Sequence, residues 1–250
     1  MDLQIVAVIT VLFVAALIAS TFGFGIGLIA MPLLAILVDI KTAASLSALV
    51  SITVVSTVLM RHWREIQFRS IWRLVVSSCV GVSLGLWLLR NMQASYMKLF
   101  LAFIVIAFSC FSLMTTRRMT LRTDRFAYVF GGVSGILGGA YTIPGPPVIV
   151  YGILRRWQPE EFRVTLLGYF LPNTLLVTLG YYFSGFMTSS VMHLYVYSLP
   201  AIFMAVIIGN HANRSIPKEK FVKFVHVLLI LLGMLLSFQA IAIIPFLSDQ

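Results

Sequence analysis

The chain has 250 residues, of which 60% are hydrophobic and only 10% are charged. A water-soluble domain cannot bury so much apolar surface, so the composition excludes one and indicates an all-α polytopic membrane protein. The net charge of +10 comes from basic residues in short loops and at helix ends, where membrane topology explains them better than nucleic-acid binding does.

The first apolar run, residues 3–38, is too long for one membrane helix. At about 1.5 Å per residue it would form a rod of about 54 Å, whereas a bilayer core needs about 20 residues. Gly23, Gly25 and Gly27 lie near its middle and loosen a helix there, and Pro32 suits the first turns of a new helix. We expect two short helices that meet at a glycine turn.

The later apolar segments repeat the order of the first half. Three segments follow the first run, each long enough for one spanning helix, and a second glycine- and proline-rich run then precedes three more. In chain order these segments cover residues 42–60, 70–89, 96–116, 126–154, 164–183, 189–209 and 221–247. The chain therefore divides into two repeats, residues 3–116 and 126–247, within one transmembrane domain of residues 1–250.

The basic residues distinguish two ways of threading the broken runs. If each run crosses the membrane once, the lysines and arginines divide almost evenly between the two sides, and no orientation follows. If each run returns to the side on which it began, 15 of the 18 basic residues share one side and leave Lys41, Arg90 and Lys98 on the other. The positive-inside rule then makes the larger group cytoplasmic and both termini extracytoplasmic.

With returning runs, each repeat makes three net crossings, so the second repeat must enter the membrane upside down. Such inverted-topology repeats occur in many transporters, whose broken segments mark the binding site. The spacing agrees with a duplication, since Pro32 and Pro147 are 115 residues apart and Gly85 and Gly209 are 124 apart. Chance similarity between glycine-rich membrane segments is the alternative.

Broken helices offer an anion site, because the first-turn N–H groups of a helix have no internal partner and carry partial positive charge. Two such helix ends, near Pro32 and beyond Gly145, are expected to face each other at mid-membrane. The donors of the second would be the N–H groups of Gly145 and Val148, helped by the Thr142 hydroxyl, since prolines have no N–H. The alternative is that the glycines only permit close helix packing.

Polar side chains of the later helices extend the candidate site. Asn173 and Thr174 follow Pro172, which frees a backbone carbonyl, so an amide side chain there can reach either the backbone or a substrate. His193 and His226 are weaker candidates for a proton relay. The substrate-binding candidates are Gly23, Gly25, Gly27, Pro32, Gly138, Gly139, Thr142, Gly145, Pro146, Pro147, Val148, Asn173 and Thr174.

Carboxylates are confined to termini and loops. They are Asp2, Asp39, Glu65, Asp124, Glu160, Glu161, Glu219 and Asp249. A Na⁺ or proton site built on acidic side chains is therefore not expected, and a cationic substrate would lack its counter-charge. We expect neither a cofactor nor a metal site.

The broken runs resemble those of the TauE/SafE family of membrane permeases, also called sulfite exporters. The segments that carry the resemblance are Gly23-Phe-Gly-Ile-Gly27 with Pro32, and residues 134–139, 145–151 and 161–165. Phe24 and Ile26 depart from the tighter glycine cluster of many members, and residues 140–144 are bulkier than expected. The resemblance covers essentially the whole chain and implies export or uptake of small sulfur-containing or carboxylated anions.

We therefore predict a multi-pass permease of the cell (inner) membrane that exports small organic or inorganic anions, either sulfur-containing, such as sulfite or a sulfonate, or carboxylated. The expected partners are the anionic substrate and the lipid bilayer, with a homodimer left open and no nucleic acid. An anion channel and a non-transporting membrane scaffold are the alternatives. An intramembrane enzyme is not expected, because the sequence has no His-Glu-x-x-His motif and its two cysteines are isolated.

Thiol labelling of intact cells tests the predicted orientation. In a chain without Cys79 and Cys110, Ser248→Cys should react with a membrane-impermeant reagent, because the C-terminus is predicted to be outside. Thr120→Cys should stay protected until the cells are opened. The reverse pattern would contradict the inverted-repeat topology.

Overall fold

The computed structural model describes residues 3–60, 68–114, 121, 123–157 and 159–212, together with residues 230 and 234. The segment predicted at residues 221–247 lies outside the described residues except for these last two. His226 lies outside them as well.

All regular elements in the described part of the chain are α-helices, and six of them are long and apolar enough to cross a membrane. These six are α1 (Leu3–Phe22), α3 (Ile40–Leu59), α4 (Phe68–Asn91), α5 (Ala94–Met114), α8 (Pro159–Phe183) and α9 (Ser189–Ala212). The shorter helices are α2 (Ile26–Leu37), α6 (Phe126–Tyr141) and α7 (Gly145–Leu154). The prediction of an all-α, multi-pass membrane protein is confirmed.

The first long run is interrupted at residues 23–25. Gly23 and Gly25 have φ angles of 84° and 109°, values that side-chain-bearing residues rarely adopt, so glycine is required for this turn. The new helix, α2, begins at Ile26, directly after the turn. Pro32 therefore lies inside α2, and the expectation that it stands in the first turns of the new helix was wrong.

The second long run is interrupted between α6 and α7. Thr142 ends α6 in the left-handed conformation with φ of 57°, and its N–H donates to the carbonyl oxygen of Gly138 at 2.7 Å. α7 then begins with Gly145, Pro146 and Pro147. Proline suits these positions because the first turn of a helix needs no N–H for internal bonds.

Each broken run returns to the edge of the molecule from which it starts. In the first run, the Gln4 side-chain amide donates to the carbonyl oxygen of Leu37 at 2.7 Å, which joins the beginning of α1 to the end of α2. In the second, the Leu121 N–H donates to the Leu154 carbonyl oxygen at 2.9 Å. Both runs are hairpins, as the second of the two topologies assumes.

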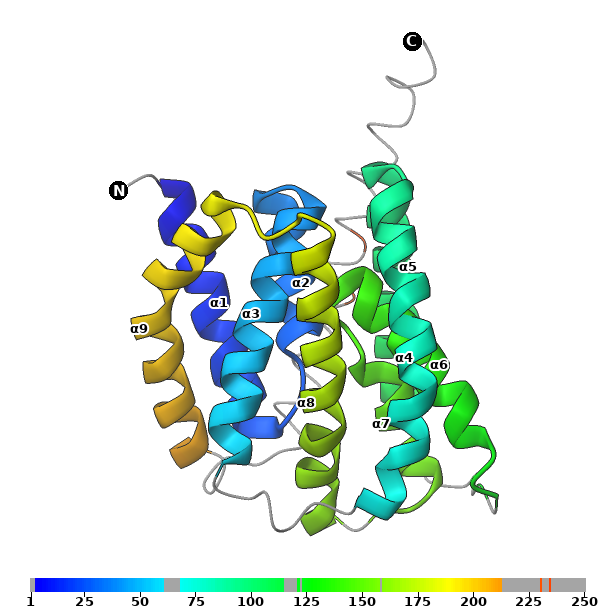
Figure 1. The fold of residues 1–250 in the computed structure, drawn as a ribbon. Helices are drawn as coiled ribbons and strands as arrows, with labels where there is room; N and C mark the ends of the chain where they lie inside the picture. The colour runs from blue at the N-terminus through cyan, green and yellow to red at the C-terminus, as the bar shows by residue number, and fades with distance from the viewer. Residues whose placement is uncertain are drawn as a thin grey trace.

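The two hairpins open toward opposite edges (Figure 1). At the upper edge of Figure 1, Lys41 at the start of α3 lies over the Phe186 ring in the α8–α9 connection, 5.3 Å from its centre. At the lower edge, Asp124 before α6 pairs with Arg73 at 2.7 Å and with Arg155 at 2.5 Å. The start of α4, the start of α6 and the end of α7 therefore share that lower edge.

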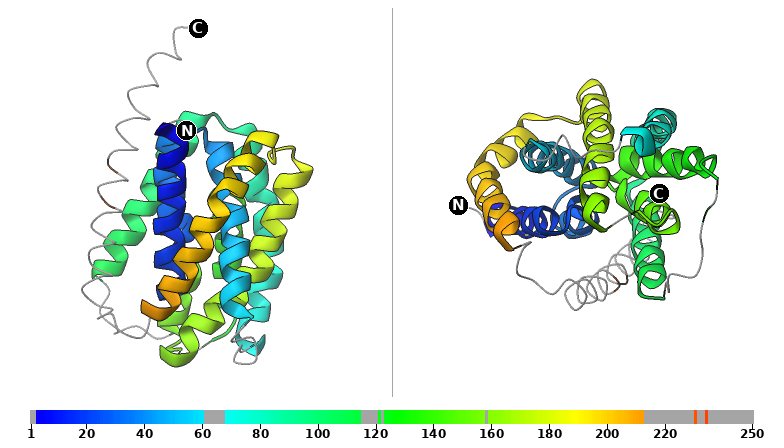
Figure 2. Two further views of the ribbon diagram at one scale, coloured as in Figure 1. Left: turned by 90° about the vertical axis from the view of Figure 1, so that its left-hand side faces the viewer. Right: turned by 90° about the horizontal axis from the view of Figure 1, so that it is seen from below.

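Helices from the two halves of the chain pack directly against each other. α1 lies along α9, α4 lies along α6, and α3 contacts α8 between these pairs (Figure 2). Glycines permit the α4–α6 contact, because a Cβ on Gly85 would overlap the Ile136 carbonyl oxygen and one on Gly135 would overlap that of Ser78. Close backbone approach through small residues is the usual way in which membrane helices associate.

Substitution of Gly135 tests this packing. Gly135→Ala should lower the melting temperature of the detergent-solubilised protein, since overpacking costs about 1–3 kcal/mol. Gly132→Ala is the matched control on the same helix, because nothing lies within 4 Å of the added Cβ and alanine favours helix over glycine. An equal loss in both variants would contradict the close contact of α4 with α6.

Candidate functional site

The two breaks touch each other inside the helix bundle. A Cβ on Gly27, in the first turn of α2, would overlap the carbonyl oxygen of Thr142 at the end of α6 and would lie 3.2 Å from Ile143. Only glycine allows this approach. The starts of the two short helices are thereby held at one place, although they are more than 100 residues apart in the sequence.

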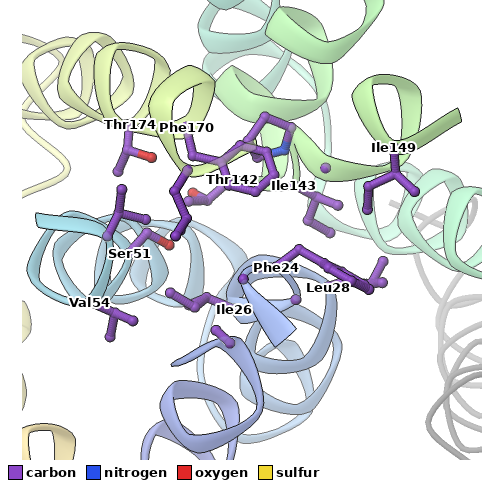
Figure 3. Close-up of a pocket in the computed structure, with 18 of the residues that line it drawn as sticks. Phe24, Ile26, Leu28, Ser51, Val54, Thr142, Ile143, Ile149, Phe170 and Thr174 are labelled. Atoms are coloured by element: carbon purple, nitrogen blue, oxygen red, sulfur yellow. The ribbon is translucent and has the colours of Figure 1, made fainter. Parts of the chain in front are cut away.

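A cavity of about 40 Å³ lies where the breaks meet (Figure 3). Its walls are residues 23–28 of the first break, residues 142–146 of the second, and side chains of α1, α3, α7 and α8. Ser51, Thr142 and Thr174 supply hydroxyl groups on one side of the cavity in Figure 3, while Phe24 and Phe170 supply apolar wall. One water needs about 10–15 Å³ in this measure, so the cavity suits a few waters or a small ion.

The cavity wall is uncharged but receives two helix N-termini. None of the residues that line it carries a formal charge. Gly25, which caps α2, and Pro144, which caps α7, make no side-chain hydrogen bond to the helices that they precede. First-turn N–H groups have no partner within their own helix, so both helix starts bring partial positive charge to the cavity.

Seven of the predicted site residues line this cavity. They are Gly23, Gly25, Gly27, Thr142, Gly145, Pro146 and Thr174. The remaining predicted residues lie outside the lining, namely Pro32, Gly138, Gly139, Pro147, Val148 and Asn173. Of these, Gly139 faces α4, where a Cβ would overlap the Val82 carbonyl oxygen, so helix packing explains it.

Asn173 belongs to a buried hydrogen-bonded chain behind the second break. Its side-chain amide donates to the Tyr169 hydroxyl at 3.4 Å, and that hydroxyl donates to Ser134 at 2.8 Å. The Ser134 hydroxyl in turn donates to the carbonyl oxygen of Pro144. Asn173 therefore supports the backbone of the break from behind.

A second set of hydrogen bonds fixes Thr142. Its hydroxyl donates to the Ala44 carbonyl oxygen in α3 at 3.1 Å and lies 3.4 Å from the Tyr181 hydroxyl. The Tyr181 hydroxyl donates to the carbonyl oxygen of Gly139 at 3.0 Å. Tyr169 and Tyr181 are fully buried, and our reading of the sequence missed both. Tyrosines within apolar helices, away from the membrane interface, are the signal that points to them, because a buried hydroxyl needs a partner.

His193 lies outside this site. It is an exposed residue near the start of α9 and does not line the cavity. Of the carboxylates whose side chains the structure describes, Asp39 caps α3 through the N–H of Lys41 at 2.9 Å and Asp124 forms its ion pairs at the lower edge. Glu160 and Glu161, which were expected in a loop, belong to the first turn of α8.

Known proteins similar to this chain are named as membrane transporters. Residues 8–236 match the family model described as Sulfite exporter TauE/SafE. A protein of Cupriavidus necator, named "Probable sulfite/organosulfonate exporter TauE", is 22% identical over 194 residues, which are 75% of this chain and 76% of that relative. A Comamonas testosteroni protein, named "Probable inner membrane transporter protein TsaS", is 22% identical over 178 residues, 70% of this chain and 74% of the relative. No solved structure matches the chain.

Gly27→Ala should separate the two breaks, because its Cβ takes the place of the Thr142 carbonyl oxygen. Hydrogen–deuterium exchange should then quicken at residues 23–28 and 142–146 in the purified protein, as local opening becomes easier. Gly145→Ala is the matched control in the same cavity wall, where the nearest atom to the added Cβ is 3.6 Å away. Unchanged exchange in Gly27→Ala would show that the breaks do not depend on this contact.

Proposed function

The chain belongs to the sulfite exporter TauE/SafE family, and on that premise we propose that it exports small anions from the cytoplasm across the inner membrane. Sulfite and organosulfonates are the first candidates, because the name of the Cupriavidus necator relative includes them, and small carboxylates are the second. The name of the Comamonas testosteroni relative supports the inner membrane as the location.

One observation carries the choice of an anion: two uncapped helix starts meet at one cavity whose wall has no charged residue. Helix N-termini bind anions through free N–H groups and partial positive charge. The partial positive charge of the same helix starts would repel a cation. The hydroxyls of Ser51 and Thr174 can donate further hydrogen bonds to oxygen atoms of the substrate, whereas the Thr142 hydroxyl already donates to the Ala44 carbonyl oxygen.

The size of the cavity supports a transporter over a channel. About 40 Å³ accommodates a small ion, whereas a channel needs a continuous water-filled path. In transporters with broken helices, substrate binds between two repeats, and the repeats rock to open the site to each side in turn. We propose this mechanism for residues 3–116 and 126–247.

The pattern of helix contacts supports an inverted repeat. If α1, α2, α3 and α4 correspond to α6, α7, α8 and α9, exchange of the two halves turns the α1–α9 contact into the α6–α4 contact. The same exchange relates α3–α9 to α8–α4, α2–α3 to α7–α8 and α1–α2 to α6–α7, and all of these pairs are in contact. The α3–α8 pair maps onto itself, as expected for helices beside a pseudo-twofold axis.

Two glycines that the spacing of the sequence relates occupy corresponding places in this scheme. A Cβ on Gly85 of α4 would overlap the Ile136 carbonyl oxygen of α6. A Cβ on Gly209 of α9 would lie 2.7 Å from the Leu17 carbonyl oxygen of α1. Gly85 thus permits the α4–α6 contact, and Gly209 permits the corresponding α9–α1 contact. A chance similarity of glycine-rich segments would not place the two glycines at corresponding helix contacts.

The distribution of charge supports cytoplasmic placement of the lower edge in Figure 1. Basic residues of the described part divide between the two edges. Arg69, Arg73, Arg125, Arg155, Arg156 and Arg163 belong to segments at the lower edge, and Lys41, Arg90 and Lys98 to segments at the upper. The positive-inside rule then makes the upper edge, where α1 begins, extracytoplasmic.

Flux measurements in liposomes test the proposal. The purified protein should move labelled sulfite or a sulfonate saturably and without Na⁺. An inside-negative potential drives an anion outward by about 2.3 kcal/mol per unit charge per 100 mV, so no coupling ion is needed. With the potential clamped by valinomycin and K⁺, net flux should reverse direction when the potential is reversed.

Three other results of the flux measurements would contradict potential-driven anion export. Ion conductance that does not saturate would indicate a channel. Flux that ignores the potential but follows a pH gradient would indicate coupling to protons and would make His193 and His226 worth testing. No flux with any sulfur-containing or carboxylated anion would exclude the proposed function.

A further inference from the structure

Arg163 is the second residue of the candidate membrane span Phe162–Phe183 in α8, at the lower edge of the molecule. Its side chain is only partly exposed, and one terminal nitrogen donates to the Ser20 carbonyl oxygen at 2.6 Å and to the Asn210 side-chain oxygen at 3.1 Å. Both acceptors are neutral. The Nε atom is buried and has no hydrogen-bond partner among the described residues.

Neither of the two carboxylates whose side chains the structure describes neutralises this charge; the side chains of Glu160 and Glu161, in the turn of α8 before Arg163, lie outside that part. Asp39 caps α3 at the opposite edge, and Asp124 pairs with Arg73 and Arg155. Burial of a charge is costly unless the charge is paired, so a partly buried cation held by neutral acceptors is a candidate for binding an anion. The sequence analysis counted Arg163 among the basic residues of the cytoplasmic side and within residues 161–165, one of the segments that resemble the TauE/SafE family.

Arg163 lies one helical turn from the cavity on the same face of α8. Leu167, Phe170 and Thr174 line the cavity, and Arg163 precedes Leu167 by four residues, which is about 6 Å along the helix axis. Its stem covers Gly23 of the first break so closely that a Cβ on Gly23 would overlap it. Arg163 does not line the cavity itself, but its stem lies against Gly23, which does, on the side of the cavity nearest the start of α8.

We propose that Arg163 binds the substrate anion at the cytoplasmic end of the cavity. A guanidinium has five N–H donors in a planar fork, and here one terminal nitrogen meets two neutral acceptors while Nε remains unpaired. A bidentate bond to the paired oxygens of a sulfite, sulfonate or carboxylate group uses Nη2 together with Nη1 or Nε, so the anion would displace the neutral Asn210 side chain from Nη2 and form stronger bonds in its place. This inference rests on the proposed function, and it adds that the substrate is an oxyanion with two accessible oxygens.

A purely structural role makes a different prediction. The bonds from Arg163 to Ser20 and Asn210 also tie α8 to the ends of α1 and α9. If these bonds only hold the helices together, a negative charge at position 210 should strengthen the contact of Arg163 with α9 and leave transport unchanged. If Arg163 binds substrate, the same charge should compete with the anion. Asn210→Asp separates the two roles because it changes charge and hardly changes shape.

The experiment compares wild type, Asn210→Asp, Arg163→Gln and Arg163→Lys in the liposome assay with sulfite, and records the melting temperature of each. We expect Asn210→Asp to raise KM for sulfite about tenfold at an equal or higher melting temperature. Arg163→Gln should raise KM at least as much, and Arg163→Lys should recover part of the affinity because it keeps the charge. Asn91→Asp, the same change at an exposed site near the end of α4, is the control and should leave KM unchanged.

The outcomes distinguish this inference from the proposed function. Sulfite flux by wild type with an unchanged KM in Asn210→Asp would overturn the role of Arg163 and leave the transporter standing. A lower maximal rate at constant KM in Arg163→Gln would do the same. Absence of flux in wild type for every oxyanion tested would overturn both. If Arg163→Gln does not fold, Asn210→Asp decides the question alone.

Discussion

Backbone that leaves a helix within a bilayer must find hydrogen-bond partners inside the protein, and this requirement shapes the centre of the molecule. At the second break, Tyr181 donates to the Gly139 carbonyl oxygen, and Ser134 donates to that of Pro144. Thr142 turns its hydroxyl to α3 while its carbonyl oxygen lies against Gly27. These contacts hold the end of α6 in place, and the starts of α2 and α7 can then face one cavity.

Glycine serves two different purposes in this fold. At Gly23 and Gly25 it permits left-handed backbone at the first break, whereas at Gly85, Gly135 and Gly139 it lets α4 and α6 approach each other. Both purposes produce the same glycine-rich pattern in a membrane segment. For this reason Gly139 was predicted as a site residue but is found in a helix interface. The sequence shows that position 139 has no side chain, but it does not show which atoms pack against that position.

Much of the architecture follows from the sequence, because run length, glycine and proline alone require the two breaks and the spans between them. The sequence predicts the helix boundaries less accurately. Pro32 was expected in the first turns of a new helix, but the positive φ of Gly25 sets the start of α2 at Ile26, six residues before Pro32. Asn173 was identified as polar and buried, yet its partner Tyr169 decides that it faces the break from behind. Such long-range partners are fixed by packing, which no local pattern records.

The two halves differ most in charge, and this difference bears on direction. In α8 the position one turn before the cavity-lining Leu167 is Arg163, whereas in α3 the position one turn before the cavity-lining Ser51 is Ser47. Lys41 stands farther out, over the Phe186 ring. If Arg163 binds the substrate as proposed, an anion meets a cation at the cytoplasmic side of the cavity, whereas the corresponding region of α3 offers only neutral side chains such as Ser51. Capture on the cytoplasmic side and release on the far side then agree with the outward pull of the membrane potential on an anion.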